Sequence, residues 1–297
     1  MKVILTGSTG HISKPLAVEL IEKEQQLTVI SSKAEKQKEI ENLGATAAIG
    51  SLYDANFLKA AFAGADVAYC MVPPPEFHQP LQKILDGYVN IVENYKEAIM
   101  HAGVKKVVIL STVGAHMDKG NGLLCYANLI EKLYNRLPKE VHIKTMRPVG
   151  FYYNLLAFIP QIKRQGQIAS NYGGNVSKPW VSPKDIAAAI AEAILSPFKT
   201  REIKYISSEE LTCNQIARIL GVEIGQPDLR WNIMTDEQML SNFKQMGMDS
   251  TTAEAMVEMN ASMNSGILYE DYQRHEPYRG KVTMAEFAKQ FAQIFNQ

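Results

Sequence analysis

The sequence has no surplus of charge of either sign. Its 31 lysine and arginine residues equal its 31 aspartate and glutamate residues, so the formal net charge at pH 7 is zero. A domain that binds nucleic acid or an anionic membrane surface usually carries a basic surplus. The composition therefore gives no electrostatic reason to expect a nucleic-acid or membrane partner.

Cysteine is scarce, and long apolar runs are absent. Cys70, Cys125 and Cys213 form no CxxC pair, and no HExxH motif is present, so we expect free thiols in a reducing compartment and no metal site. No apolar run is long enough to cross a bilayer, and Lys2 precedes a short strand and a glycine rather than a signal peptide. We therefore expect a cytoplasmic protein.

Short apolar strands alternate with amphipathic helices in the first half of the chain. The helical apolar spacing is longest from Leu81 to Ile99, and this helix is predicted to end at Gly103. Strands joined through helices make right-handed crossovers and a parallel sheet. The predicted fold class is α/β, with a doubly wound parallel Rossmann sheet. Its strands are expected at residues 3–5, 27–30, 46–49, 67–72, 107–110 and 143–146.

A glycine loop lies between the first predicted strand and the first predicted helix. Gly7 permits a tight turn, and Gly10 lets the backbone approach a pyrophosphate, which the N-terminus of the helix would bind. Ser13 stands where a third glycine is usual, and its small side chain still allows close packing of helix on strand. This strand–loop–helix context favours a dinucleotide site over an ordinary turn. Its contacting residues are expected to be Gly7, Ser8, Thr9, Gly10, His11 and Ile12.

The end of the second strand bears on which dinucleotide is bound. An acidic residue at this position favours the 2′-hydroxyl of NAD. The sequence has Ser31, Ser32 and Lys33 there instead. Hydroxyls and a lysine suit the 2′-phosphate of NADP, although Lys33 as a solvated loop charge is an equally simple interpretation. The sequence therefore favours NADP, with NAD as the alternative.

The second half of the chain contains three clear helix starts. Ser182 precedes Pro183, and Thr235 and Thr283 each begin a capping box with a glutamine or glutamate three residues later. A strand is expected at residues 203–206, and Phe287, Phe291 and Phe295 make a docking face on the last helix. We predict a dinucleotide-binding domain at residues 1–150 and a smaller, mostly helical substrate or lid region at residues 151–297, with an interleaved boundary.

Three segments together resemble the NmrA-like family of atypical short-chain dehydrogenase/reductases: GSTGHIS at 7–13, TMRPVGFY at 145–152 and WVSPKDIA at 180–187. This family includes quinone reductases and redox-sensing regulators. The resemblance implies that several strand ends border the dinucleotide, in agreement with the rule that open α/β sheets bind ligands at the carboxyl ends of their strands. These bordering residues are Met71, Val72, Pro73, Ser111, Thr112, Pro148 and Phe151.

The usual proton donor of a carbonyl reductase is incomplete. In Tyr-x-x-x-Lys, the lysine lowers the tyrosine pKa from about 10. Tyr126 precedes a predicted helix, but Ile130 follows four residues later, and Asn128 stands where quinone reductases of the resembled family often have a lysine. Local packing is therefore the simpler role for Tyr126. We place Tyr126, Asn128 and Tyr152 in the substrate pocket and assign no catalytic residue.

The leading hypothesis is NADPH-dependent reduction of a quinone or a similar small apolar acceptor, because a quinone can accept hydride while its protons come from water. The alternative is a non-catalytic NAD(P) redox sensor that signals to a regulated protein partner. A nucleotide-sugar epimerase is disfavoured by the missing lysine.

Overall fold

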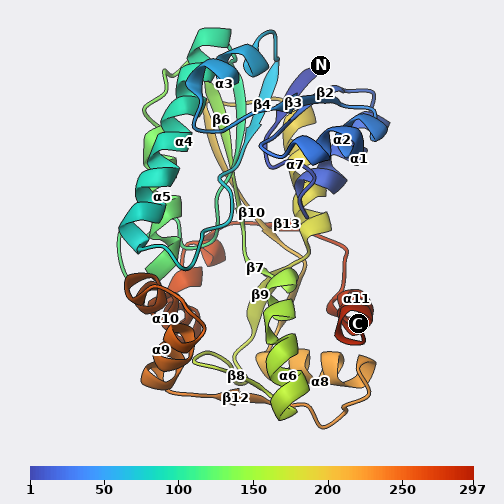
Figure 1. Ribbon diagram of the computed structural model, residues 1–297, viewed down its shortest axis with the longest axis vertical. Helices are drawn as coiled ribbons and strands as arrows, with labels where there is room; N and C mark the ends of the chain where they lie inside the picture. Colours follow the sequence, from blue (N-terminus) through green and yellow to red (C-terminus); the bar gives the residue numbers. More distant parts are fainter.

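The computed structural model describes residues 1–297, and an eight-stranded parallel sheet runs through its upper half in Figure 1. The strands lie in the order β13-β10-β6-β5-β4-β1-β2-β3. The predicted doubly wound parallel sheet is confirmed. Its strands are β1 (Lys2–Leu5), β2 (Gln26–Ser31), β3 (Thr46–Ile49), β4 (Val67–Cys70), β5 (Lys106–Leu110), β6 (His142–Pro148), β10 (Arg201–Ser207) and β13 (Tyr278–Arg279).

The direction of the strand order reverses at β1. The chain adds β2 and β3 on one side of β1 and then returns to add β4, β5 and β6 on the other side. The connection after β1 therefore runs towards one edge of the sheet, and the connection after β4 runs towards the other edge. Ligands of open α/β sheets bind at the carboxyl ends of the strands beside such a point, and the glycine loop follows β1 there.

Helices cover both faces of this sheet (Figure 1). Apolar residues of α1, α2 and α7 pack in one core cluster, and those of α3, α4 and α5 pack in a second cluster on the opposite face. A buried leucine or isoleucine contributes about 1.5–3 kcal/mol through removal from water. The helices are α1 (Ser13–Glu22), α2 (Gln37–Asn42), α3 (Ala55–Phe62), α4 (Leu81–Ala102), α5 (Cys125–Tyr134) and α7 (Pro183–Leu195).

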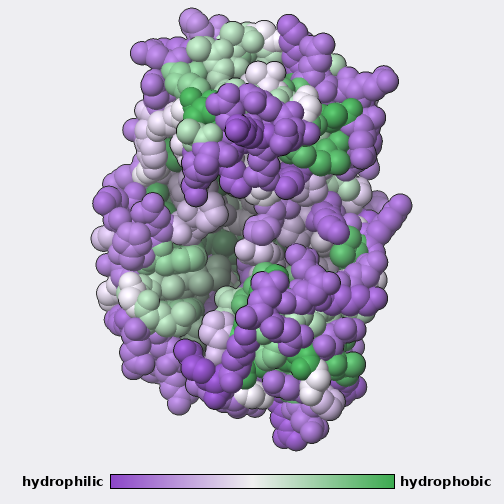
Figure 2. All heavy atoms as spheres, turned by 45° about the vertical axis from the view of Figure 1, so that its right-hand side comes forward, coloured by the Kyte–Doolittle hydropathy of each residue, from purple (hydrophilic) through white to green (hydrophobic).

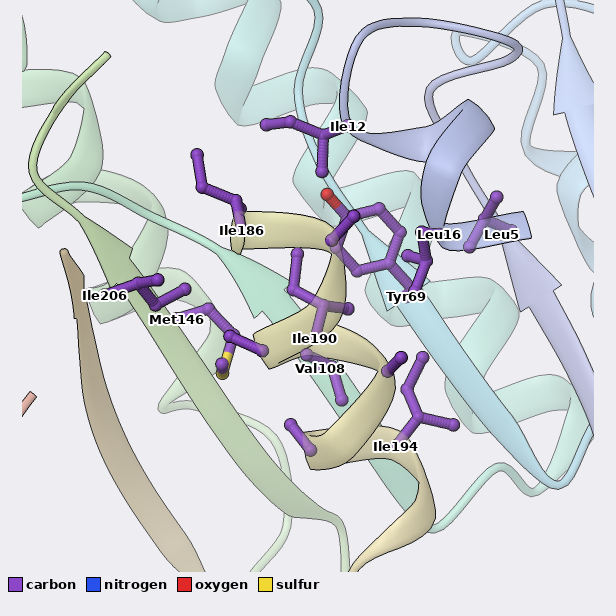
Figure 3. Close-up of a cluster of buried hydrophobic side chains, with 14 of the residues drawn as sticks. Leu5, Ile12, Leu16, Tyr69, Val108, Met146, Ile186, Ile190, Ile194 and Ile206 are labelled. Atoms are coloured by element: carbon purple, nitrogen blue, oxygen red, sulfur yellow. The ribbon is translucent and has the colours of Figure 1, made fainter. Parts of the chain in front are cut away.

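The first of these clusters anchors the glycine loop. Ile12 is buried and belongs to the same apolar cluster as Leu16 of α1 and Tyr69 of β4. Figure 3 shows Ile12 at the hydroxyl end of the Tyr69 ring and Ile186 and Ile190 of α7 close by. The loop therefore has one side fixed in the core, which holds its backbone in place at the end of the sheet.

The chain after residue 150 contributes more to the sheet than the sequence predicted. We expected a region beside the sheet, but β10 pairs with β6 in parallel, β13 pairs with β10, and α7 packs on the sheet with α1. The reason is that β6 leaves an open edge, which a parallel strand from a later part of the chain can pair. The domain boundary at residue 150 stays a prediction.

Smaller elements complete the lower half of Figure 1. Two short sheets have the orders β11-β9-β7 and β12-β8. The strands are β7 (Gly150–Phe151), β8 (Ile168–Ser170), β9 (Lys178–Val181), β11 (Glu209–Leu211) and β12 (Trp231–Ile233). The helices of this half are α6 (Ile159–Gln165), α8 (Cys213–Glu223), α9 (Asp236–Gln245), α10 (Ser250–Ser265) and α11 (Met284–Phe295). The 3-10 turns of the whole chain are η1 (Ala34–Lys36), which precedes α2, η2 (Gly122–Leu124), η3 (Tyr152–Phe158), η4 (Ile267–Tyr269) and η5 (Tyr272–Arg274).

The predicted helix starts of this half are confirmed. The Ser182 hydroxyl accepts a hydrogen bond from the Lys184 N–H at 3.2 Å, and Thr235 and Thr283 form complete capping boxes. Such caps satisfy N–H groups that have no partner within the helix. The aromatic face predicted for the last helix is also confirmed, because Phe287, Phe291 and Phe295 are buried in the core cluster of the lower half.

No helix is both long enough and apolar enough to cross a bilayer. All three cysteines are free thiols.

Candidate dinucleotide and active site

The glycine loop makes a tight turn that needs glycine at its first position. Gly7 has φ 93°, a left-handed conformation that disfavours side chains. A Cβ at Gly7 would also collide with Met71 and Ser13. The Ser13 hydroxyl donates a hydrogen bond to the Thr6 carbonyl at 3.0 Å. Serine therefore takes the place of the third glycine without separating α1 from β1.

Main-chain N–H groups at the start of α1 face no backbone acceptor. Thr9, His11, Ile12 and Ser13 donate no backbone hydrogen bond, whereas the Gly10 N–H donates to the Gly7 carbonyl at 3.2 Å. The residue that caps α1, Ile12, has no side chain that could accept these hydrogen bonds. Free N–H groups together with the positive end of a helix dipole suit a pyrophosphate.

The residues after β2 differ in accessibility. Ser31 is buried, and its hydroxyl accepts hydrogen bonds from the Ser8 hydroxyl at 2.9 Å and from the Lys33 N–H at 3.2 Å. Ser32 and Lys33 are exposed, and Lys33 forms no ion pair. Ser31 therefore ties the strand end to the glycine loop, and the two residues after it can reach a ligand.

One acidic residue beside the glycine loop, Glu39, is not predicted from the sequence. Glu39 of α2 reaches back to this loop and accepts hydrogen bonds from Thr9 Oγ1 at 3.0 Å, Lys14 Nζ at 2.8 Å and Lys36 Nζ at 2.8 Å. The sequence places no acid at the end of β2, but the fold brings one there from α2.

The segment after β4 is fixed by tyrosines of α4. The Met71 N–H donates to Thr6 Oγ1 at 2.8 Å. The Tyr95 hydroxyl donates to the Met71 carbonyl at 3.0 Å, and the Tyr88 hydroxyl donates to the Pro73 carbonyl at 2.9 Å. Met71 and Val72 are half-buried and Pro73 is exposed, so this segment forms a rigid rim next to the loop.

The end of β5 is engaged in a buried polar contact. The Ser111 hydroxyl donates to the Glu131 carboxylate of α5, and the Thr112 hydroxyl lies 3.5 Å from the Pro148 carbonyl at the end of β6. Ser111, Thr112 and Pro148 are all buried. Ser111 and Thr112 therefore hold neighbouring elements together at the carboxyl end of the sheet.

Arg147 of β6 is the centre of this buried polar network. Its guanidinium donates to Glu131 at 2.9 and 2.7 Å, to Asp271 at 2.9 Å and to the Tyr205 hydroxyl at 3.0 Å. Burial alone would lower the pKa of Arg147, but the hydrogen bonds and the charge of Glu131 raise it above its usual value. The network joins α5, β6 and β10 to the segment between η4 and η5.

Tyr126 has no activating cation. Its ring packs on Tyr88, with 5.3 Å between the ring centroids, and burial raises its pKa to about 12. Lys132, six residues further along α5, is paired with Asp118 at 2.5 Å. The amide of Asn128 donates to the Ala115 carbonyl at 2.9 Å. The position of a reductase tyrosine is therefore occupied by a weakly acidic phenol.

The structure corrects the placement of Tyr152. This residue was expected in the pocket, but it is fully buried, and its hydroxyl donates to Glu209 and to the Val282 carbonyl. Its neighbour Tyr153 is exposed and packs on His11 with the two rings tilted by 39° and 3.9 Å between their centroids. Both tyrosines belong to the 3-10 turn η3, in which successive side chains point about 120° apart, so one tyrosine faces the core and the next faces the glycine loop. Phe151 is half-buried.

The surface is hollowed near this site. Figure 2 shows a deep recess at mid-height, with hydrophobic residues gathered beside it. In Figure 1 this is the height at which β6 ends and β7 begins. No group of three or more His, Cys, Asp or Glu side chains is arranged to hold a metal ion.

Both the sequence and the fold are similar to those of known proteins. The sequence profile of the NmrA-like family matches residues 1–288. The chain is 26% identical over 299 residues to an NAD(P)H azoreductase of Xenophilus azovorans, covering 99% of each protein. An NADPH-dependent quinone oxidoreductase of Escherichia coli, complexed with NADPH, has a TM-score of 0.80 at 17% identity, with 97% of this chain and 99% of that chain covered. A triphenylmethane reductase of Citrobacter sp., complexed with NADP(H), has a TM-score of 0.76 at 16% identity, covering 98% and 100%.

Proposed function

Because the chain belongs to the NmrA-like family, we propose that it is an NADPH-dependent oxidoreductase that reduces a quinone or a similar small apolar acceptor. The free N–H groups at the start of α1, beside the reversal of the strand order, carry this proposal. They would bind the pyrophosphate, and the ends of β4, β5 and β6 would border the nicotinamide half. The azoreductase, quinone oxidoreductase and triphenylmethane reductase named above support this class of reaction.

The contacts of Tyr126 favour an acceptor that needs no strong acid from the protein. Bound NADPH supplies a hydride. A quinone that gains this hydride becomes a hydroquinone anion, which takes its proton from water. A ketone or a sugar intermediate needs a proton donor in the transition state, and Tyr126, with its raised pKa, is a poor one. Quinone reduction is therefore favoured over carbonyl reduction and epimerisation.

A second candidate function follows from the same observation. Since the pKa of Tyr126 is raised and no lysine activates this residue, the protein could also bind NAD(P) as a sensor and act on a protein partner. Oxidation of NADPH by a panel of quinones and azo compounds separates the two. The proposed function requires acceptor-dependent oxidation, and a protein that binds NADPH but oxidises none of the panel is a sensor.

We also propose that the protein is located in the cytoplasm, because its three cysteines are free thiols, which are typical of a reducing compartment.

Tyr126→Phe is expected to keep most of the acceptor-dependent NADPH oxidation. The substitution removes the hydroxyl and keeps the ring that packs on Tyr88. A general acid contributes about 10²–10⁴-fold to the rate. Steady-state rates with one quinone, measured beside wild type, check this expectation. A loss of that size with NADPH affinity unchanged would show that Tyr126 is the proton donor.

Lys33→Ala is expected to weaken NADPH binding by about tenfold or more and to leave NADH binding unchanged. The reason is that a charge-assisted hydrogen bond to the 2′-phosphate would be lost. Titration of both cofactors measures the effect, and Lys38→Ala, which removes an exposed lysine from α2, is the matched control. Equal affinities of the wild type for NADPH and NADH would contradict the preference for NADP.

A further inference from the structure

The carboxylate of Glu39 occupies an anion position next to the glycine loop. One hydroxyl and two ammonium groups converge on it, from Thr9, Lys14 and Lys36. These donors come from three separate segments, namely the loop, α1 and the turn before α2. The hydrogen bonds from Lys14, Lys36 and Thr9, in decreasing order of effect, lower the pKa of Glu39 to about 2. The carboxylate is therefore ionised throughout the neutral range.

This position lies at the adenosine end of the proposed dinucleotide site. Thr9 belongs to the glycine loop, and the loop is tied to the end of β2 by the hydrogen bond between Ser8 and Ser31. The ribose of a dinucleotide contacts the residues that follow this strand. Hydroxyl and ammonium donors are also the groups that bind a phosphate monoester. The three partners of Glu39 thus match the donors that a 2′-phosphate requires.

We propose that Glu39 competes with the 2′-phosphate of NADPH for Thr9, Lys14 and Lys36, and thereby sets the preference of this protein between NADPH and NADH. The inference rests on the proposed function, because it assumes that the dinucleotide binds at the glycine loop. NADH has no 2′-phosphate, so it leaves the three contacts of Glu39 intact. NADPH replaces the carboxylate with its phosphate, and the Glu39 side chain, which is 32% exposed, turns towards solvent.

Charge explains why this competition costs NADPH affinity. Lys14, Lys36 and Glu39 together carry one positive charge in the free protein, whereas the two lysines alone would carry two. A phosphate must therefore displace a like-charged group and is attracted more weakly than by the lysines alone. Salt screens both the attraction of the lysines for the phosphate and their attraction for the Glu39 carboxylate, since all three side chains are partly exposed.

The test is titration of NADPH and NADH against Glu39→Gln at low and at high salt. Glutamine keeps the size of the side chain and removes its charge. The expected result is an NADPH affinity about fivefold to tenfold higher than that of wild type at low salt, a smaller gain at high salt, and an NADH affinity within about twofold. Glu41→Gln is the matched control, because Glu41 is exposed on the same helix and the one side-chain hydrogen bond of its carboxylate comes from Gln37. It is expected to bind both cofactors as wild type does.

Lys14→Met provides a second test from the opposite side of the ion pair. It is expected to weaken NADPH binding by about tenfold and to leave NADH binding within about twofold. An unchanged or weaker NADPH affinity in Glu39→Gln would overturn the inference, as would an equal gain in Glu41→Gln or an unchanged NADPH affinity in Lys14→Met. If the wild type binds neither cofactor, the proposed function fails first, and the role of Glu39 fails with it.

Discussion

Gly10→Asp is expected to lower NADPH affinity by about 100-fold or more without unfolding the protein. Gly10 is exposed and has no left-handed φ, and a Cβ there would meet only the Gly7 carbonyl at 3.2 Å. A small shift accommodates the new side chain, but its carboxylate would lie among the free N–H groups that receive the pyrophosphate. Loss of these charge-assisted contacts costs about 3 kcal/mol or more, which corresponds to that factor.

This variant is measured by NADPH titration, with circular dichroism and thermal unfolding as checks on the fold. Gln290→Glu adds the same charge at an exposed position of α11 and is the matched control. NADPH binding by Gly10→Asp within about threefold of wild type would place the dinucleotide elsewhere. Gly7 is the poorer choice for this experiment, because its left-handed backbone and its contacts with Met71 and Ser13 make any side chain there destabilising.

Arg147→Met is expected to lower the free energy of unfolding by about 3–5 kcal/mol. The substitution keeps the volume of the apolar stem but leaves the buried Glu131 carboxylate without its cation, and Asp271 loses one of its two close partners. Removing one partner of a buried ion pair costs about this much, since the remaining charge stays in a medium of low dielectric. Urea unfolding of the variant and of wild type measures the difference.

Two further variants show whether the effect comes from the buried charge. Lys132→Met breaks the exposed ion pair with Asp118 and is expected to change the free energy of unfolding far less than Arg147→Met does, because solvent screens this pair. Adding Glu131→Leu to Arg147→Met removes the stranded carboxylate and is expected to restore part of the lost stability. If Arg147→Met unfolds at the same urea concentration as wild type, the network does not hold the C-terminal region to the sheet.

The sequence was sufficient for the features that depend on local pattern. The alternating strands and helices predicted the parallel sheet, and the capping boxes at Thr235 and Thr283 predicted two helix starts, because both signals arise from residues close together in the chain. The glycine loop is also a feature that residues close together in the chain determine. Its dihedral angle at Gly7 and the anchoring of Ile12 follow from a strand, a turn and a helix in immediate succession.

The features that the sequence could not provide depend on contacts between distant segments. Glu39 lies 30 residues from Thr9, and Asp271 lies 124 residues from Arg147, so no local spacing links them. The two tyrosines after β7 illustrate a further limit. Tyr152 and Tyr153 are adjacent and chemically identical, and only the packing of η3 decides that the first is buried and the second reaches His11.

The most direct test of the central claim is a single turnover of protein-bound NADPH. Wild type is mixed with slightly less than one equivalent of NADPH, a quinone is added, and the absorbance of the reduced nicotinamide is followed in a rapid-mixing instrument. We predict rapid oxidation that depends on quinone concentration and slows when the transferred hydrogen is replaced by deuterium. Gly10→Asp should show only the rate of free NADPH. Bound NADPH that stays reduced in wild type would contradict the account and identify the protein as a binder of the cofactor without reductase activity.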